Sequence, residues 1–378
     1  MTVKLADYKG LLEDLGPQQF VPTALDLIES GEMKLGDIGL KNLFKAHIGD
    51  PETKLRESDD SLSRLFQGDE TKLQEDVNAS AFSVVTKKLL SSEVIAAYDE
   101  FPKIGPELVT VLNSTKKEDN IPGLTDLDEP VALNEREEAP EASFDEKWCR
   151  LGEQRYARQL SITRQMILFD QTGMVALKAQ DLGTGAARFE ERQTIQQAID
   201  YNSTSWYVGS DDGQTVTRTA QWDSGTNHLT SNAFASAGVL NTARLRLIAQ
   251  TNGKGRRIYV IPKILLMPEA LGDTAFEYLK SVLKSAANAI NPYGPNGRDQ
   301  YRNLKVLTSP VLDDISTVQW YYGDPAIQTI KKVVWPLEVV KAPQASGSDF
   351  AAEVVSRYMV TMNFAVGLRD NKYLSKNL

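Results

Sequence analysis

The sequence predicts an α+β protein made of several structural units, and three patterns support this prediction. Apolar residues recur at helical spacing through the first hundred residues and again from about 172 to 201. Helix and strand patterns are mixed between 204 and 330, and apolar residues alternate with polar ones, as in strands, from Val333 onward. A chain of 378 residues has room for two or three units at roughly 150 residues per domain.

Residues 1–78 predict short helices separated by polar connectors. The stretches ADYKGLLEDLG, PTALDLIESG and GLKNLFKAHIG each show helical spacing and end in glycine. We therefore expect an appended helical region rather than a domain with a large core. Two further helical pieces are predicted between Asn78 and Glu100.

Residues 118–160 predict an extended acidic hairpin. Their first part holds three prolines and a Pro-Gly turn, and KWCRLGEQRYARQLSIT then alternates polar and apolar residues as a strand does. Two arms of about 17 residues would reach about 55 Å. A hairpin this long and polar is predicted to lie against another chain.

Net charge is concentrated in the same segment. The whole chain carries 42 basic and 51 acidic residues, and residues 118–147 alone hold eleven acids against two bases, which equals the total of −9. The rest of the chain is balanced, so no basic face for nucleic acid is left over. The segment is either a solvated acidic linker or an arm that docks on a partner's basic surface.

Elements downstream follow from local patterns. Residues 172–201 predict a helix about 45 Å long, with Gly183 and Gly185 either breaking it or allowing close helix packing. Residues 236–250 predict a second helix. The other expected elements are a short buried strand at RRIYVIP, a helix beginning at Pro268, strands at LKVLTSPVL and VQWYYGD, and closing strands from Val333 to Val366.

Signatures of enzymes, metals and membranes are lacking in the sequence. It has no phosphate-binding loop and no nucleophile elbow, and LGTGAAR lacks the third glycine of a dinucleotide site. One cysteine, Cys149, and two histidines, His47 and His228, all but exclude structural zinc. No apolar run is long enough to span a membrane, and the N-terminal residues do not resemble a secretory signal.

Two aromatic clusters, one at Trp206-Tyr207 and one at Trp320-Tyr321-Tyr322, have two interpretations. They could stack on bases or a ligand. Because no Lys or Arg residues are interleaved with them, we favour a structural role at a sheet or an interface.

Four segments occur in the order found in major capsid proteins of tailed double-stranded DNA bacteriophages. They are SITRQMILFDQTG, WDSGTNHLTSNAFASAGVLNTAR, IPKILLMPEAL, and NPYGPNGRDQYRNLKVLTSPVLDD with its following WYYGDP. Together with the order of elements, they make residues 78–378 resemble a capsid protein of the Hong Kong 97 fold, most like the Mu-type major head subunit. Two features depart from the family. The Asn227-His228 order is inverted, so His228 takes no role from the resemblance, and residues 1–78 have no counterpart.

The resemblance implies a domain plan for the whole chain. It comprises a helical N-terminal extension (1–78), an N-terminal arm (79–117), an extended acidic hairpin loop (118–160), a peripheral domain with a spine helix (161–203), an axial domain (204–332) and closing strands of the peripheral domain (333–378). The extension is either a scaffold-like segment removed by cleavage or a part retained in the shell.

The function implied by the resemblance is structural rather than enzymatic and needs no cofactor or metal. The chain would assemble into hexamers and pentamers of an icosahedral virion capsid, with portal and scaffold or decoration proteins as partners. It would enclose double-stranded DNA without sequence specificity or contact with a membrane, after assembly in the host cytoplasm.

Inter-subunit contacts are expected between the acidic hairpin and basic residues of a neighbour. The acids are Glu135, Glu137 and Glu138, and the bases are Arg150, Arg155 and Arg158, with Lys87, Lys88 and Arg164 as further candidates. Two other functions remain open at this point. One is an encapsulin-type nanocompartment with cellular cargo, and the other is an enzyme with an unrecognised site.

Overall fold

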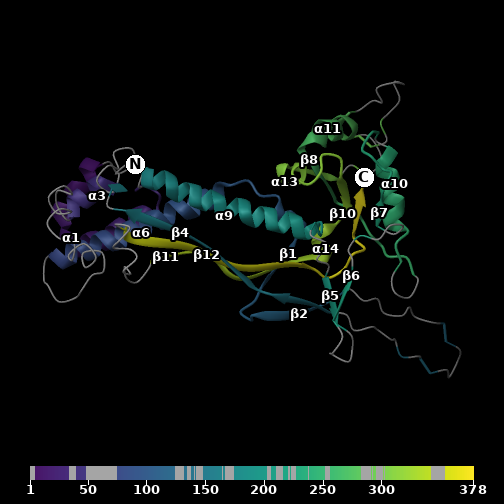
Figure 1. The fold of residues 1–378 in the computed structure, drawn as a ribbon, viewed down its shortest axis with the longest axis horizontal. Helices are drawn as coiled ribbons and strands as arrows, with labels where there is room; N and C mark the ends of the chain where they lie inside the picture. The colour runs from purple at the N-terminus through teal and green to yellow at the C-terminus, as the bar shows by residue number, and fades with distance from the viewer. Residues whose placement is uncertain are drawn as a thin grey trace. The chain divides into compact units, whose positions relative to one another are not determined.

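A computed structural model gives the fold of the chain (Figure 1). It describes residues 5–33, 40–47, 75–123, 132–133, 138–139, 141, 148–163, 165–166, 174–201, 206–209, 216–219, 222, 227–236, 238–251, 256–281, 291, 293–294, 301, 303–341 and 354–378. Within these ranges, no helix is both long and apolar enough to cross a membrane.

The chain divides into two compact units. The first comprises Met1–Pro102, Arg155–Glu190 and Trp335–Asn363, and the second comprises Lys103–Gln154, Glu191–Val334 and Phe364–Leu378. Helix α9 (Met174–Ala198) and strands β11 (Thr329–Lys341) and β12 (Val354–Leu368) contribute residues to both. The presence of helices and sheets throughout confirms the predicted α+β class.

Three N-terminal helices belong to the first unit: α1 (Leu5–Glu29), α3 (Leu40–His47) and α6 (Glu75–Glu100). The short helix predicted at GLKNLFKAHIG is confirmed by α3. The two pieces predicted before it and the two predicted between Asn78 and Glu100 are wrong, because α1 and α6 are single long helices. Gly16, where the first piece was expected to end, lies inside α1, and the turn that follows the helix contains Gly31, whose φ of 73° favours glycine.

The N-terminal helices also share a large core, contrary to the expectation of an appendage. α1 and α3 both pack on α6. Their buried residues join those of α6, α9 and the strands in one cluster, which includes Tyr8, Phe20, Ile28, Leu43, Leu89, Val94, Ala179 and Tyr358. The helix lengths therefore follow from this burial, which outweighs the local preference of glycine to end a helix.

Helix α9 is unbroken through Gly183 and Gly185 (Figure 1). A Cβ atom on Gly183 would lie 2.2 Å from the backbone oxygen of Val94 on α6, whereas a Cβ on Gly185 would meet no atom within 4 Å. The alternative prediction, that the two glycines break this helix, was therefore wrong. Close packing against α6 explains Gly183.

A four-stranded sheet has the order β1-β11-β12-β4, with β1 (Thr110–Asn113) parallel to β11. Strand β4 (Gln154–Thr163) lies in this sheet. The predicted second arm of the hairpin therefore stops at β3 (Trp148–Gly152), which pairs antiparallel with β2 (Glu118–Pro122) over five residues of each strand. The expected arms of about 17 residues are not found among the described residues.

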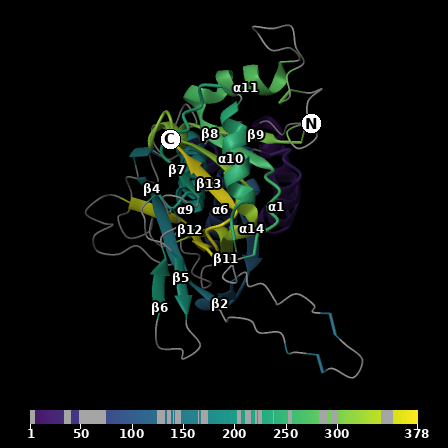
Figure 2. The same cartoon turned by 90° about the vertical axis from the view of Figure 1, so that its right-hand side faces the viewer.

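The second unit contains a five-stranded sheet of order β7-β13-β10-β8-β9. Helices α10 and α11 lie beside it (Figures 1 and 2). Its elements are β7 (His228–Leu229), α10 (Gly238–Ile248), β8 (Ile264–Pro268), η1 (Glu269–Leu271), α11 (Gly272–Lys280), β9 (Lys305–Ser309), α13 (Pro310–Asp313), β10 (Trp320–Gly323) and β13 (Leu374–Asn377). The short helices α7 (Gly105–Leu108) and α14 (Pro325–Gln328) and the hairpin of β5 (Trp206–Gly209) and β6 (Val216–Thr219) complete the unit.

Strand β10 places its three aromatic residues in the interior. Trp320, Tyr321 and Tyr322 are all buried, and the Trp320 indole Nε1 donates to the Asn232 carbonyl oxygen at 2.8 Å. These side chains therefore form core and are closed to stacking on a base. The side chains of Trp206 and Tyr207 fall outside the description.

Two strand predictions need correction in this unit. RRIYVIP is not a strand; it exposes Tyr259, and the buried strand is β8, which follows it. The segment 333–378 is not all one set of closing strands either, because β13 pairs with β10 and β7 in the five-stranded sheet. Pro268 ends β8 and is at the same time the N-cap of η1, which leads directly into α11, so the helical segment predicted to begin at this proline is found.

Candidate functional site

The base of the acidic hairpin is held by a small apolar cluster. Ile121 of β2 and Cys149 and Leu151 of β3 are buried together with Ile330 and Leu368. All five residues belong to the second unit. The cluster fixes where the two strands of the hairpin begin.

A buried lysine adds an electrostatic anchor to the hairpin base. The side chain of Lys332 on β11 is 0% exposed, and its Nζ lies 2.9 Å from Asp119 Oδ2 and donates to the Lys116 carbonyl oxygen at 2.6 Å. A buried ammonium needs such partners because it has lost its water. A hydrogen bond from Ser114 and the interaction with Lys332 hold the pKa of the Asp119 carboxyl below its usual value. The pair therefore ties β2 to β11.

Arg150 makes an ion pair within its own chain. Its guanidinium contacts Glu118 across the β2–β3 pair, and both side chains are about half exposed. The hydrogen bond from Arg150 lowers the pKa of Glu118. A neighbour's acidic hairpin would therefore compete with Glu118 for this arginine.

Arg155 and Arg158 are exposed on β4, an edge strand of the described four-stranded sheet. Arg155 Nε donates to Thr361 Oγ1 of β12 at 3.2 Å, and Arg158 makes no ion pair with any residue that the structure describes. Because successive residues of a strand alternate between faces, these two arginines point to opposite sides. Only a segment lying along the strand edge could reach both.

Of the predicted acids, only Glu138 is described, and it is exposed. Glu135 and Glu137 lie outside the described residues. Among the further candidates, Lys87 is exposed, Lys88 Nζ lies 2.6 Å from Glu29 Oε1, and Arg164 is outside the description. The proposed contact between the acids and the arginines stays a prediction, since it concerns two copies of the chain.

Sequence reasoning missed the Asp119–Lys332 pair. The signal was present in TIKKVVW, where Lys332 falls two residues after the buried Ile330 and so occupies an inward position of the alternation. A lysine at an inward position predicts a carboxylate partner.

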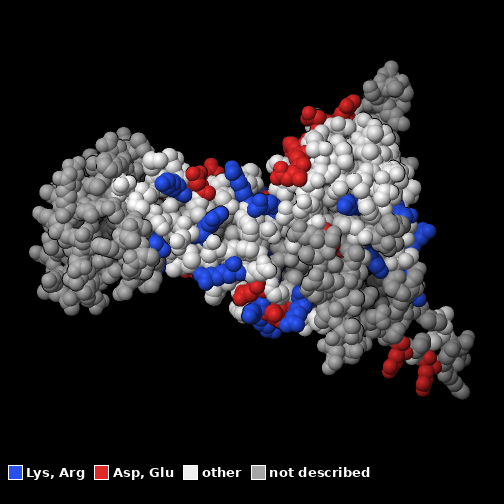
Figure 3. All heavy atoms as spheres, in the orientation of Figure 1, with Lys and Arg blue, Asp and Glu red and all other residues white. Residues whose placement is uncertain are grey.

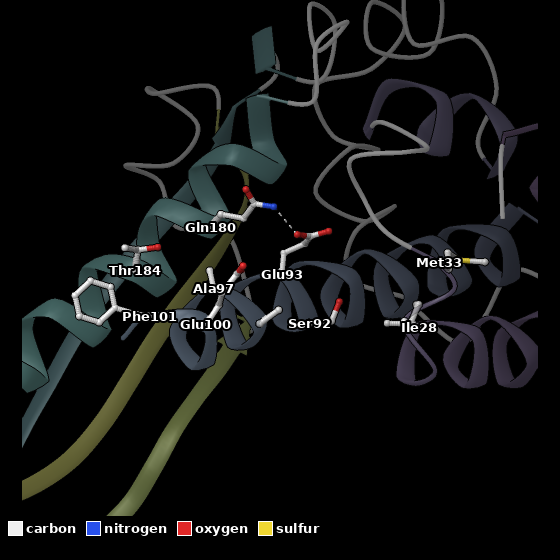
Figure 4. Close-up of a pocket in the computed structure, with 11 residues that line it drawn as sticks. Ile28, Met33, Ser92, Glu93, Ala97, Glu100, Phe101, Gln180 and Thr184 are labelled. Atoms are coloured by element: carbon white, nitrogen blue, oxygen red, sulfur yellow. Dashed lines mark hydrogen bonds between the residues drawn. The ribbon is translucent and has the colours of Figure 1, made fainter. Parts of the chain in front are cut away.

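A cavity of about 560 Å³ in the first unit is the other candidate (Figure 4). It lies between α6, α9 and the end of α1, and the largely buried carboxylate of Glu93 accepts a hydrogen bond from Gln180 Nε2 at 2.8 Å. A second carboxylate, that of Glu100, also lines the cavity, about two helical turns further along α6. In the part of the chain that the structure describes, no group of three or more His, Cys, Asp or Glu residues could hold a metal ion.

Comparison with known proteins gives a family match. A model of the phage capsid protein family matches residues 153–377, a range that includes all four segments noted in the sequence. No curated protein matches the chain.

Similar solved structures include a virus-like particle from Pyrococcus furiosus, with TM-score 0.41, 8% identity, and coverage of 76% of this chain and 97% of that one. The mature capsid of bacteriophage PhiM1 has TM-score 0.48, 12% identity, and coverage of 73% and 87%. A structure from Mycobacterium phage Bobi has TM-score 0.45, 16% identity, and coverage of 74% and 90%. The family assignment rests on the family model rather than on these distant similarities.

Proposed function

We propose, because the chain belongs to the phage capsid protein family, that it forms the icosahedral head of a tailed phage or prophage from hexamers and pentamers of itself. The protein is a structural component of a capsid shell. The match over residues 153–377 is the observation that carries this conclusion, since it covers most of both units after the hairpin.

The domain roles follow the plan expected for a Hong Kong 97-type protein. The 25-residue helix α9 is proposed as the spine of a peripheral domain, and the five-stranded sheet with α10 and α11 as the centre of an axial domain. The boundary of the first unit at Trp335 supports a peripheral segment beginning near residue 333. The C-terminal strand β13 is assigned to the axial domain instead, because it pairs with β10.

The acidic hairpin is proposed to lie on a neighbouring copy. Its acids need positive charge or water, and Glu138 and Glu141 are exposed in the single chain. Arg155 and Arg158 on the edge strand β4 of a neighbour offer that charge, and an edge strand also presents unpaired backbone groups to an extended segment. Arg150 would take part only where it exchanges Glu118 for an acid of the neighbour.

Other partners are proposed from the family alone. Packaged double-stranded DNA would be held without sequence specificity, which agrees with a net charge of −9 and the lack of a basic excess outside the hairpin. A portal protein and scaffold or decoration proteins would complete the head in the host cytoplasm.

Size-exclusion chromatography with light scattering tests the proposal. The purified full-length chain should elute as capsomers or larger assemblies across a range of protein concentration, salt and pH. A monomer under every condition, including high concentration, would contradict the proposed function.

A further inference from the structure

The second unit carries opposite charges on different surfaces. In Figure 3, Asp and Glu side chains gather over α11 and α13, and Lys and Arg side chains gather on the side of α10. The exposed acids on the first of these surfaces are Glu269, Asp273, Glu277 and Asp314. A surface on which acidic and basic side chains are interspersed carries no large field of one sign. Here each sign has a region of its own, so each region can attract the opposite charge.

Helix α11 combines its negative charge with an exposed ring. Ala275 and Leu279 face the core, whereas Phe276 is 66% exposed and lies between Asp273 and Glu277 on the outer face. We call the group Glu269, Asp273, Phe276 and Glu277 the acidic–apolar surface.

Helix α10 and the segment after it also combine exposed apolar side chains with charged ones, but here the charges are positive. Leu245 is 56% exposed between Arg244 and Arg246, and Tyr259 is 94% exposed two residues after the exposed Arg257. A bridge between Thr251 and Arg257 and a hydrogen bond from Ile258 N to the Gln250 carbonyl oxygen at 2.9 Å hold this segment beside the end of α10. We call the group Leu245, Arg246, Arg257 and Tyr259 the basic–apolar surface.

We propose that the basic–apolar surface of one copy docks on the acidic–apolar surface of the next. Exposed aromatic and leucine side chains with a charged rim have the composition of a protein interface. In a symmetric two-fold contact one neighbour would have to cover both surfaces at once, which suits surfaces on a shared face rather than two that gather over different elements. A head-to-tail contact brings opposite charges together at every junction, and such a contact closes into a ring when the rotation allows it.

The occupant of each surface is therefore a second copy of this chain, and this inference rests on the proposed shell function. It adds the residues and the polarity of one contact between neighbours. It does not involve the acidic hairpin, so the two contacts can be tested separately.

Charge reversal provides the test, with assembly of the full-length chain measured by light scattering and electron microscopy. Arg246→Glu with Arg257→Glu, and separately Asp273→Lys with Glu277→Lys, should each raise the concentration needed for assembly at least about tenfold. Combining all four substitutions in one chain should restore most of the assembly, because every junction again joins opposite charges. Circular dichroism and thermal unfolding of each variant establish that the monomer still folds.

Two further variants give matched comparisons. Phe276→Ser should weaken assembly without lowering thermal stability, since the ring is exposed in the single chain. Glu338→Lys, which reverses an exposed acid on β11 in the first unit, should assemble like the unchanged protein.

The outcomes separate this inference from the proposed function. If the unchanged chain forms shells and the two charge-reversed variants do so equally well, the head-to-tail contact is wrong and the shell function stands. Failure of the four-fold variant to recover, while both double variants are folded and defective, also contradicts the pairing of these surfaces. If the unchanged chain never assembles, the proposed function fails, and this inference fails with it.

Discussion

At the scale of single residues, the ion pair between the buried Lys332 and the partly exposed Asp119 predicts a pH-dependent contribution to stability. The pKa of the Asp119 carboxyl is lowered in the folded chain from its ordinary value of 3.8. A lowered folded-state pKa gives stability that is present above the unfolded pKa and is lost as the pH falls through the folded pKa. Asp119→Asn should therefore lower the midpoint of thermal unfolding at pH 7.

Thermal unfolding measured across a series of pH values tests whether the charge of the Asp119 carboxylate is responsible. The difference between Asp119→Asn and the unchanged chain should shrink progressively below about pH 4. Asp14→Asn, which changes an exposed acid on α1, serves as the control and should have little effect at pH 7. A constant difference for Asp119→Asn across the whole pH range would mean that the carboxylate charge is not what stabilises the hairpin base.

Gly183 and Gly185 form a matched pair for testing the packing of α9. Gly183→Ala places a Cβ against the Val94 carbonyl oxygen, a backbone atom that cannot move away alone, so we expect a loss of about 1–3 kcal/mol in unfolding free energy. Gly185→Ala meets open space and should gain about 0.5–1 kcal/mol, because alanine favours a helix over glycine. Chemical denaturation measures both. Equal effects of the two substitutions would show that the α6–α9 contact is not tight.

Sequence reasoning at this scale succeeded where the local pattern carried the information. The inward residues Leu240, Ala243 and Leu247 of α10 follow from helical spacing, and all three are buried. The partner of Lys332 could not be predicted in the same way, because Asp119 lies more than 200 positions earlier in the chain. A pairing at that separation depends on the fold as a whole.

At the scale of elements, the N-terminal helices differ most from expectation. Gly16 and Gly31 suggested two short helices, but Gly16 lies inside α1, and only Gly31 lies just beyond its end at Glu29. The local sequence pattern shows only where a helix could end. Helix α1 continues past Gly16 because its Tyr8, Phe20 and Ile28 side chains are buried in the core. The same burial makes the extension part of the core of the first unit.

Deletion of residues 1–47 should therefore destabilise the first unit. Val85, Leu89, Leu90 and Val94 of α6 are buried in a cluster shared with α1 and α3. Each side chain that becomes exposed costs about 1.5–3 kcal/mol. The truncated chain should bind a hydrophobic dye and unfold at a lower temperature. If it is as stable as the full chain and binds no dye, the segment is dispensable, as expected of a scaffold-like piece removed by cleavage.

The acidic hairpin gives the second prediction at this scale. Replacing Glu135, Glu137 and Glu138 with glutamine should weaken assembly at low salt and leave folding of the monomer intact. The difference should fade near 1 M salt, where screening acts over roughly 3 Å. Light scattering during assembly at several salt concentrations measures this.

A matched control removes three exposed acids from the N-terminal helices instead. Asp14→Asn, Asp99→Asn and Glu100→Gln change the net charge by the same amount. Should both triple variants assemble alike at every salt concentration, the hairpin acids act only as a solvated tip, and docking on the arginines of a neighbour is wrong.

At the scale of the whole molecule, the order of elements was more informative than any single motif. Helical arm, acidic segment, long helix, mixed region and closing strands led to the phage capsid family, and the family match confirms it. Sheet partners were less predictable. Strand β13 has only four residues, and it pairs with β10 some fifty positions earlier and with β7 still further away, so no local pattern marks its place.

Electron microscopy of the purified full-length protein in negative stain tests the central claim most directly. We predict closed shells, or the rings from which they form, tens of nanometres across after concentration of the unchanged chain. Fields of particles no larger than a single 41.9 kDa chain, under the same range of salt and pH, would contradict the claim that this protein forms a capsid.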